Sequence, residues 1–577
     1  MEGLEITVLL GLTILVGTLL APRVRLALPL VLVVFGLLLG FIPALREVQL
    51  PPETVLLLFL PVMLFWESLT TSLRSIRRDF RYILPMSTLL VVASAFAVAG
   101  VAVLFGMRWE VALILGAAVA PPDATAVAAL GRLLPRRTFM KLKAESLTND
   151  GTALVLYAIA VSIAVGGQVT PLVVTWTLIV SYLGGIMVGV VAAAAAWLLL
   201  RRARTTIVIN VTMLLLPFAA FMVAELIHAS GVLAVVVAGL IAAYLRSDVT
   251  TAASRRQAEA AWPFGVFLLN GALFVLIGLE VQWVAHQTSL QTIGWLSLAT
   301  VAVWGVLLVV RFLFQVLGAP FQRMGAGTPH PLGLRTRMQV VSTVAGMRGA
   351  VSLAIALSVP LTAPDGTVLS GRDDIVFVTA GVILLSLLVQ GPLLPAVVRW
   401  ARYPADNGED EEFELAERSI TGAAMAALDA LAAEHGISDE VRDRVRRDGY
   451  EMLELANARS FARERALIDA EVGAMEDLLD SPDPLADGTT DPTSSATAAD
   501  GTTLQMVATS TDVDLEQRSP LIRHDEYSRL KLAILEHKRQ VLASLRRSGV
   551  IDDLVVHRIS ARLDLDQIRM EGIEEFE

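Results

Sequence analysis

The chain has 577 residues, of which 55% are hydrophobic and 18% charged, and its mean hydropathy is +0.64. This composition is far too apolar for a soluble protein, and the apolar residues come in runs of about 18–25, enough to cross roughly 30 Å of hydrocarbon as a helix. The lack of cysteine excludes disulfides, thiolate metal sites and cysteine nucleophiles. The seven histidines form no metal-binding motif such as HExxH.

In chain order, the sequence predicts an all-α polytopic membrane protein with about thirteen transmembrane helices. They cover residues 4–20, 26–44, 54–72, 83–105, 110–130, 145–166, 171–200, 206–227, 231–245, 262–279, 293–316, 338–360 and 375–398. The first lacks a basic leader and a cleavage site, so we expect a retained span and not a signal peptide. The ninth is short, and the count is twelve if Ser230-Gly231 only interrupts a longer helix.

Basic residues in the connections predict the orientation. The connections on one side of the thirteen alternations hold 21 basic residues, against three on the other (Arg46, Arg108 and Arg372). Because cytoplasmic loops are enriched in Lys and Arg, the N-terminus is expected outside and the C-terminus in the cytoplasm. We therefore expect a multi-pass protein of the inner or plasma membrane, with the lipid bilayer as its surroundings.

Composition changes after Trp400. Residues 1–400 have a net charge of +9 and residues 401–577 a net charge of −19. We interpret 1–400 as the transmembrane domain, 401–479 as a cytoplasmic helical segment, 480–520 as a disordered linker and 521–577 as a C-terminal helical segment. The tail carries no catalytic constellation. A regulatory or assembly role and an appendage without a role in transport both fit.

Several ionisable side chains lie inside predicted spans, where each costs several kcal/mol and needs a reason. The deepest are Glu67, Asp123, Glu145, Asp150 and Arg348. Glu225 and Arg311 lie nearer span ends, from which a side chain can reach the interface.

Asp123 follows two adjacent prolines, Pro121 and Pro122, halfway along the fifth span. Two prolines remove two amide donors and clash with the preceding turn, so the helix is expected to break near the membrane midplane. Such breaks expose carbonyls and helix ends that bind ions. Asp123 would then start the second half-helix, where the dipole favours a carboxylate. A structural Asp at a simple proline kink is the alternative.

The segment from Glu145 to Asp150 opens the sixth predicted span. At 100° per residue, Ser146 and Asp150 share one face, and Glu145 and Asn149 the adjoining one. Carboxylate, hydroxyl and amide oxygens are the ligands a small hard cation prefers. A carboxyl group removed from water also holds a proton more readily, so one group can carry either a proton or a cation. A helix start rich in polar caps is the alternative for Glu145.

Two arginines could balance these acids. Arg348 lies between Gly346 and Gly349 in the twelfth span, and two glycines there permit either close packing or a second break. Arg311 lies toward the cytoplasmic end of the eleventh span, at a depth that matches Glu145. Depth therefore allows a Glu145–Arg311 pair, with Arg348 as the other candidate partner and snorkelling as the alternative for Arg311.

At these residues the chain resembles the electroneutral sodium/proton exchangers of the monovalent cation:proton antiporter superfamily, in their bacterial branch, over roughly residues 5–400. The similar motifs are Ala120-Pro121-Pro122-Asp123-Ala124, Glu145-Ser146-Leu147-x-Asn149-Asp150, Ile277-Gly278-Leu279-Glu280 and Gly346-x-Arg348-Gly349-Ala350. Many relatives have Thr-Asp-Pro where this chain has Pro122-Asp123-Ala124, so a threonine ligand is missing here.

The resemblance implies an inverted-repeat fold with discontinuous crossing helices, a homodimer and elevator-like movement of the ion-binding core. It implies Asp150 as the carrier of ion and proton, supported by Asp123 and Asn149. It also implies that Glu145 and Arg311 form an ion pair, with Arg348 as the other basic residue of this region. Ser146 and Glu67 complete the expected ion site, and Asp150 and Asp123 would contact the transported cation.

We therefore expect an antiporter that exchanges sodium, or potassium, for protons in pH and salt homeostasis, without enzymatic activity, a cofactor or a nucleic-acid partner. An intramembrane protease would need Ser146 and His228, which lie at opposite ends of their predicted spans. A receptor that signals through its tail would not need buried carboxylates. A channel or an organic-anion symporter is also possible, but an anion site should lack two buried acids such as Asp123 and Asp150.

Overall fold

The computed structural model is helical throughout the part of the chain that it describes. It describes residues 2–571 except 25, 43–51, 124–133, 167–169, 204, 288, 323–331, 361–368, 370, 403–407, 455–456, 459–460, 462–464 and 466–519. The chain forms two compact units. The first comprises Met1–Asn407 with Asp552–Leu554, and the second Gly408–Ile551 with Val555–Glu577.

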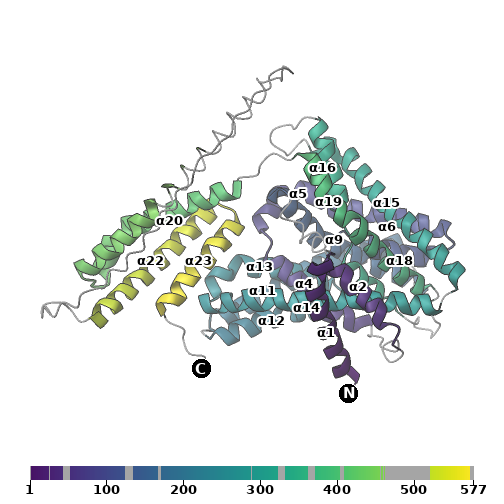
Figure 1. Cartoon of the computed structure of the whole chain (residues 1–577), viewed down its shortest axis with the longest axis horizontal. Coiled ribbons are helices and arrows are strands. Elements are labelled where there is room, and N and C mark those ends of the chain that lie inside the picture. The colour runs from purple at the N-terminus through teal and green to yellow at the C-terminus, as the bar shows by residue number, and fades with distance from the viewer. Residues whose placement is uncertain are drawn as a thin grey trace, which may run out of the picture. The chain divides into compact units, whose positions relative to one another are not determined.

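The first unit is a bundle of apolar helices (Figure 1). Within the described residues, eight helical stretches are long and apolar enough to cross a membrane, and four shorter apolar helices accompany them. The helices are α1 (Glu2–Val24), α2 (Leu28–Leu39), α4 (Pro52–Leu69), α5 (Leu73–Ser87), α6 (Leu89–Leu104), α7 (Trp109–Val119), α9 (Arg136–Ala164), α10 (Pro171–Ile179), η2 (Val180–Gly184), α11 (Gly185–Leu200), α12 (Thr206–Leu226), α13 (Gly231–Val249), α14 (Ala252–Gln287), α15 (Leu290–Gln322), α16 (Leu332–Val344), α17 (Ala350–Leu357), α18 (Arg372–Leu385), η3 (Ser386–Gln390) and α19 (Gly391–Ala401).

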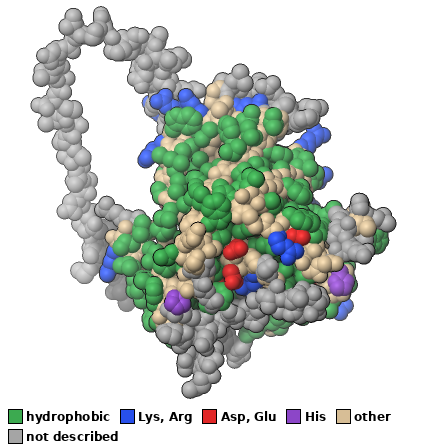
Figure 2. Space-filling view, turned by 90° about the vertical axis from the view of Figure 1, so that its right-hand side faces the viewer, with side chains coloured by type: hydrophobic (Ala, Val, Ile, Leu, Met, Phe, Trp, Pro, Cys, Tyr) green, Lys and Arg blue, Asp and Glu red, His purple; other side chains and the backbone are tan. Residues whose placement is uncertain are grey.

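The outer surface of this unit is apolar, as lipid contact requires. Along α15, for example, Leu298 and Val309 are each 54% exposed, and Phe96 of the neighbouring α6 is 57% exposed. Figure 2 shows a broad hydrophobic face over this side of the molecule, with Lys and Arg gathered along its upper edge. A surface of this kind would be insoluble in water, so a membrane environment follows.

Most predicted spans correspond to helices, but several helices begin earlier than the hydropathy suggests. The sixth predicted span, 145–166, is the longer helix α9, which begins at Arg136. The fourth, 83–105, is preceded by the arginine-rich α5, which begins at Leu73. Hydropathy does not locate the starts of these two helices because their first turns are amphipathic and carry several charges. Ser230-Gly231 separates two helices, α12 and α13, which pack against each other.

The second unit is a small helical domain with its own apolar core. Its helices are α20 (Gly408–Glu434), a helix over 439–454, α22 (Pro520–Ser548) and α23 (Asp553–Glu571). Ile420 of α20, Leu542 of α22 and Ile559 of α23 are at most 3% exposed and share one cluster. Within 401–479 and 521–577, which the sequence analysis predicts to be helical, the structure describes these helices over part of each range. The expected linker, 480–520, lies outside the described residues except for Pro520.

Candidate ion site

Two breaks in the helical structure meet inside the first unit. Helix α7 ends at Val119, one residue before Pro121 and Pro122, which cannot continue the helical hydrogen-bond pattern. The second interruption lies between α16 and α17, at residues 345–349. The Asp123 amide donates to the Met347 carbonyl oxygen at 2.8 Å, which joins the two interruptions. The expected half-helix after Asp123 lies outside the described residues.

Arg348 binds the open helix ends at this junction. Its side chain is 4% exposed, and its Nε and Nη2 donate to the carbonyl oxygens of Val119 and Ala120 at 2.7 and 3.1 Å. Nη1 also donates to the Gly346 carbonyl oxygen. The Val119 carbonyl has lost its helical partner, because the Asp123 amide donates to Met347, so the guanidinium both satisfies this carbonyl and opposes the negative end of the α7 dipole. Arg348 thus contacts backbone, and the partner of Glu145 is a different arginine.

The two glycines beside Arg348 allow close packing as well as the second break. A Cβ atom on Gly349 would lie 1.9 Å from Asp123 Oδ2, inside the carboxylate. A Cβ atom on Gly346 would lie 2.7 Å from Arg311 Nε. Both positions therefore need glycine because neighbouring functional side chains occupy the space of a side chain.

Helix α9 carries the central acid. Asp150 is 2% exposed, and Ser146, Asn149 and Glu145 on the same helix are no more exposed. Because α9 begins at Arg136, Glu145 lies more than two turns inside the helix. Its interpretation as part of a polar helix start is therefore wrong. The Asn149 Nδ2 atom lies 3.5 Å from the Pro122 carbonyl oxygen, which connects α9 to the first interruption.

Three carboxyl groups share this region. Glu67 of α4 and Asp123 lie near enough to Asp150 for their charges to act on it. Glu67 is 8% exposed, and its Oε1 atom, like Asn149 Oδ1 and Ser352 Oγ, has no hydrogen-bond partner among the described residues. Such oxygens are costly to bury unless something else binds them. Within the described residues, no three acidic or histidine side chains converge closely enough to chelate a metal ion.

Glu145 and Arg311 form a buried ion pair. Arg311 Nη1 lies 2.5 Å from Glu145 Oε1, and Nη2 lies 3.1 Å from Oε2, so the contact is bidentate. Arg311 Nε also donates to the Ser342 carbonyl oxygen at 3.0 Å. The pair therefore ties α9 to α15 and α16. It lies beside the ion-site residues of α9 and uses both oxygens of Glu145 for Arg311.

Lys143 is a further charged residue near the site, and in the sequence it stands out only as one of the basic residues expected on the cytoplasmic side. Its Nζ atom donates to the Thr70 carbonyl oxygen at 3.0 Å and contacts Thr70 Oγ1 at 2.6 Å. It also interacts electrostatically with Glu67. In the sequence, only the position of Lys143 could have pointed to the site, because it precedes Asp150 by about two turns on one helix.

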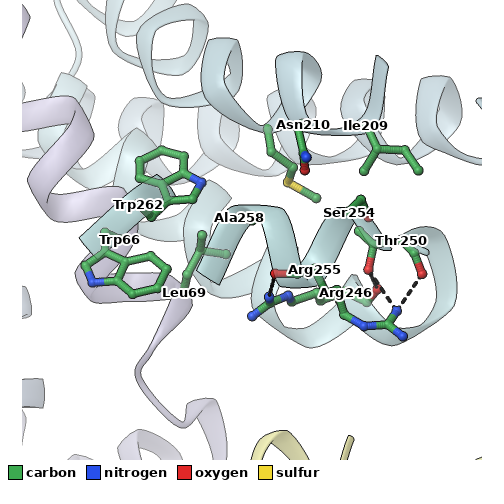
Figure 3. Close-up of a pocket in the computed structure, with 11 residues that line it drawn as sticks. Trp66, Leu69, Ile209, Asn210, Arg246, Thr250, Ser254, Arg255, Ala258 and Trp262 are labelled. Atoms are coloured by element: carbon green, nitrogen blue, oxygen red, sulfur yellow. Dashed lines mark hydrogen bonds between the residues drawn. The ribbon is translucent and has the colours of Figure 1, made fainter. Parts of the chain in front are cut away.

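A small pocket elsewhere in this unit contains none of the buried carboxyl groups. It has a volume of about 20 Å³, room for about one water molecule, and it is lined by residues of α4, α12, α13 and α14 (Figure 3). The rings of Trp66 and Trp262 stack at one end, 6.2 Å apart. Its arginines already have partners: Arg255 Nη1 donates to the Thr250 carbonyl oxygen at 2.5 Å, and Arg246 Nη2 lies 3.4 Å from the Arg255 carbonyl oxygen. We therefore place the site at the helix interruptions.

The residues needed for a protease lie apart in the fold. Ser146 is buried within α9, whereas His228 is exposed in the turn after α12. That turn holds His228 at a positive φ of 57°.

Comparison with known proteins identifies a family. Residues 11–400 match the family described as "Sodium/hydrogen exchanger, transmembrane". The chain is 38% identical over 576 residues to a protein named "Uncharacterized Na(+)/H(+) exchanger" of Mycobacterium tuberculosis, an alignment that covers 98% of this chain and 96% of that one. It is 29% identical over 416 residues to the Na(+)/H(+) antiporter ApNhaP of Aphanothece halophytica, covering 70% and 75% of the two chains. A "Sodium, potassium, lithium and rubidium/H(+) antiporter" of Bacillus pumilus is 27% identical over 423 residues, covering 69% of this chain and 62% of that one.

The fold is similar to that of a solved antiporter. The sodium proton antiporter MjNhaP1 of Methanocaldococcus jannaschii superposes with a TM-score of 0.54 and 19% sequence identity. The superposition covers 70% of this chain and all of that one. At this identity the likeness concerns the fold alone.

Proposed function

This chain belongs to the sodium/hydrogen exchanger family, and we propose that it exchanges sodium ions for protons across the plasma membrane with Asp150 as the carrier. It is a multi-pass membrane transporter and not an enzyme. The observation that carries the proposal is the burial of Asp150 in α9, which packs against α7 and α17, in electrostatic contact with Glu67 and Asp123. A buried carboxyl group is stable when it holds a proton or a cation, but not when it is bare.

The oxygen atoms around Asp150 are suited to weak binding of the transported cation. Asp123, Asn149, Ser146 and Glu67 would supply the other ligands, together with water and exposed carbonyl groups. A proton and a cation cannot occupy the same carboxylate, so each ion displaces the other. That competition, followed by a change in the side to which the site opens, produces exchange.

Sodium is the first choice of cation, and potassium the alternative. The names of ApNhaP and the Bacillus relative include sodium, and the latter's also includes potassium. Pro122 stands where many family members have a threonine, so one hydroxyl ligand is absent from this site. Exchange measured with sodium, potassium and lithium in turn will rank the cations.

We extend the proposal to the architecture. We propose thirteen spans related by inverted repeats, with the N-terminus outside, discontinuous helices crossing at the site and a helical tail in the cytoplasm. Glu145 and Arg311 would serve as a structural ion pair. A homodimer, with a role in pH and salt homeostasis, completes the proposal. The boundaries remain 1–400 for transport, 401–479 and 521–577 for the helical parts of the tail, and 480–520 for the linker.

Replacement of Asp150 by asparagine tests the carrier. The D150N protein should fold but lose sodium-driven proton movement in vesicles, because an amide cannot alternate between proton and cation. Glu225→Gln is the matched control, since Glu225 is an exposed acid at the end of α12 and should not be needed for exchange. Vesicles that contain D150N and still change their internal pH in response to sodium would show that another group is the carrier.

A further inference from the structure

Helix α5 occupies the position of a helix at a membrane surface. It begins a helical stretch of 32 residues, Leu73–Leu104. About 20 residues suffice to cross the hydrocarbon, so a count back from Leu104 reaches roughly Pro85. The turns of α5 before Pro85 then lie at the level of the lipid headgroups, and at the first of them Asp552 and Asp553 accept hydrogen bonds from the hydroxyl groups of Ser75 and Ser72. At the other end of this stretch, the rings of Phe105 and Trp295 pack 5.1 Å apart, as is typical of the opposite interface.

The exposed side of α5 has two adjoining strips. Leu73, Phe80 and Leu84 are 39–50% exposed and fall within about 40° of each other around the helix. Beside them, at the same end of the unit, lie exposed arginines, which we name the basic face of α5: Arg77, Arg78 and Arg81. An apolar strip next to a basic strip is the pattern of helices that insert at the boundary between acyl chains and headgroups.

The charge of the basic face is available to a ligand. Among the described residues, neither the Arg77 nor the Arg81 side chain has an ion pair or a hydrogen bond. Arg78 reaches Asp79 at 3.8 Å with a side chain that is 54% exposed. Three guanidinium groups on one and a half turns attract phosphate groups, which accept the forked hydrogen bonds that arginine offers.

The opposite side of α5 packs on the helix that carries Asp150. Ile83 and Met86 are each 1% exposed, and α5 lies along α9. Asp79 of α5 pairs with Lys141 of α9 at 3.5 Å, and the Lys141 ammonium group lies 5.2 Å from the centre of the Tyr82 ring. A ligand that holds α5 at the membrane surface therefore also acts on the first turns of α9.

We propose that the basic face of α5 binds the phosphate groups of anionic phospholipids in the cytoplasmic leaflet, and that bound lipid raises the rate of exchange through α9. The apolar strip of Leu73, Phe80 and Leu84 distinguishes a lipid from free phosphate, because only a lipid supplies acyl chains for it. The binding step rests on the proposed orientation, and the effect on rate rests on the proposed function.

Lipid binding is tested first, without transport. Short-chain phosphatidylglycerol is titrated into the full-length protein in neutral detergent, with short-chain phosphatidylcholine and inorganic phosphate as comparison ligands. Replacement of Arg77 and Arg81 by glutamine should weaken phosphatidylglycerol binding roughly 30-fold, since each basic side chain near an anionic surface contributes about fivefold. The double lysine variant R77K/R81K should retain most of the binding. Replacement of Arg201 and Arg202, an exposed pair elsewhere, by glutamine should leave the binding of phosphatidylglycerol unchanged.

Exchange is then measured in vesicles of phosphatidylcholine with and without one fifth phosphatidylglycerol. The wild-type rate should rise several-fold with the anionic lipid, and R77Q/R81Q should lose that rise while matching the wild type in phosphatidylcholine alone. Equal binding of the two lipids by the wild type would overturn the proposal, as would unchanged binding by R77Q/R81Q. A slower R77Q/R81Q rate in both membranes would assign the arginines to another partner, such as the acidic tail. A protein without exchange would contradict the proposed function, whereas the titration would still decide lipid binding.

Discussion

Gly349 shows how little space separates the chemistry of the site from its backbone. Replacement by alanine would place a methyl carbon where Asp123 Oδ2 now lies, so the carboxylate or α17 must move. We expect G349A to lower the free energy of unfolding by about 1–3 kcal/mol, as for other overpacked sites, and to slow exchange strongly. Gly305→Ala is the matched control, because a Cβ there meets nothing within 4 Å. A G349A protein with the melting temperature and exchange rate of the wild type would contradict this account.

The Glu145–Arg311 pair is a second test at the scale of single residues. Removal of one partner strands the other charge in a buried position, so E145Q and R311M should each cost about 3–5 kcal/mol of stability. The double variant should lose less stability than the sum of the two single losses. A variant with the two residues swapped, Arg at 145 and Glu at 311, should partly regain stability. Melting curves in detergent give the double-mutant cycle. Effects that add within about 0.5 kcal/mol would show that the pair is energetically uncoupled.

Residue chemistry alone pointed to the acids but not to their surroundings. A buried carboxylate has few explanations in a membrane span, so Asp123 and Asp150 could be named from the sequence. Depth in the membrane allowed either Arg311 or Arg348 as the partner of Glu145, and in the structure Glu145 pairs with Arg311. The contact of Lys143 with Thr70 could not be predicted, because it joins two residues that are 73 positions apart in the chain.

At the scale of elements, the two helix interruptions depend on a single side chain. Arg348 donates to three carbonyl groups around the junction, and a planar guanidinium can reach groups that lie in different directions. A lysine ammonium keeps the charge but cannot span the same three acceptors. We expect R348K to lose about 1–3 kcal/mol for each carbonyl left unsatisfied, together with most of the exchange.

Arg399→Lys provides the control for R348K. Arg399 is an exposed residue in the last turn of α19, and its replacement should change stability by less than about 0.5 kcal/mol. Both variants are compared by melting temperature and by exchange in vesicles. If R348K behaves like R399K, the charge of Arg348 matters more than its hydrogen bonds, and the role of a carbonyl cap is excluded.

Helix interruptions and helix ends differ in how well a sequence predicts them. The break after Val119 was predictable because Pro121 and Pro122 remove hydrogen bonds locally. The break before Ala350 remained one of two possibilities, because glycine permits a break without requiring it. The meeting of the two breaks depends on tertiary packing. The start of α5 was missed because hydropathy detects helices through apolar residues, and arginine interrupts that signal.

At the scale of the whole molecule, the resemblance to sodium/proton exchangers is confirmed by the family match over residues 11–400. The all-helical membrane fold was predictable because hydrophobic length and charge bias act along the whole chain. The tail was less predictable, since its core forms between α20 and the helices α22 and α23, and more than 80 residues separate α20 from α22. Local patterns gave its helices but not their packing.

The charge balance of transport is a prediction for the whole molecule. If Asp150 alone carries either one proton or one monovalent cation, each half-cycle moves the same charge in opposite directions. Exchange should then be electroneutral, and the initial rate of sodium-driven proton movement should not change when the potential is clamped. One uncompensated charge would instead add about 2.3 kcal/mol of driving force per 100 mV, which a rate measurement would detect. Strong buffers on both sides separate this effect from one of pH.

Glu67 decides how a failure of this prediction should be interpreted. It is a second buried acid with an oxygen that lacks a hydrogen-bond partner among the described residues, and it lies near Asp150 and Lys143. If Glu67 also took up a proton in each cycle, two protons would exchange for one cation and a sustained current would flow across a solid-supported membrane. Such a current would contradict electroneutral exchange. Its disappearance in Glu67→Gln, with exchange retained, would identify Glu67 as the second proton carrier, whereas persistence of the current would place that carrier elsewhere.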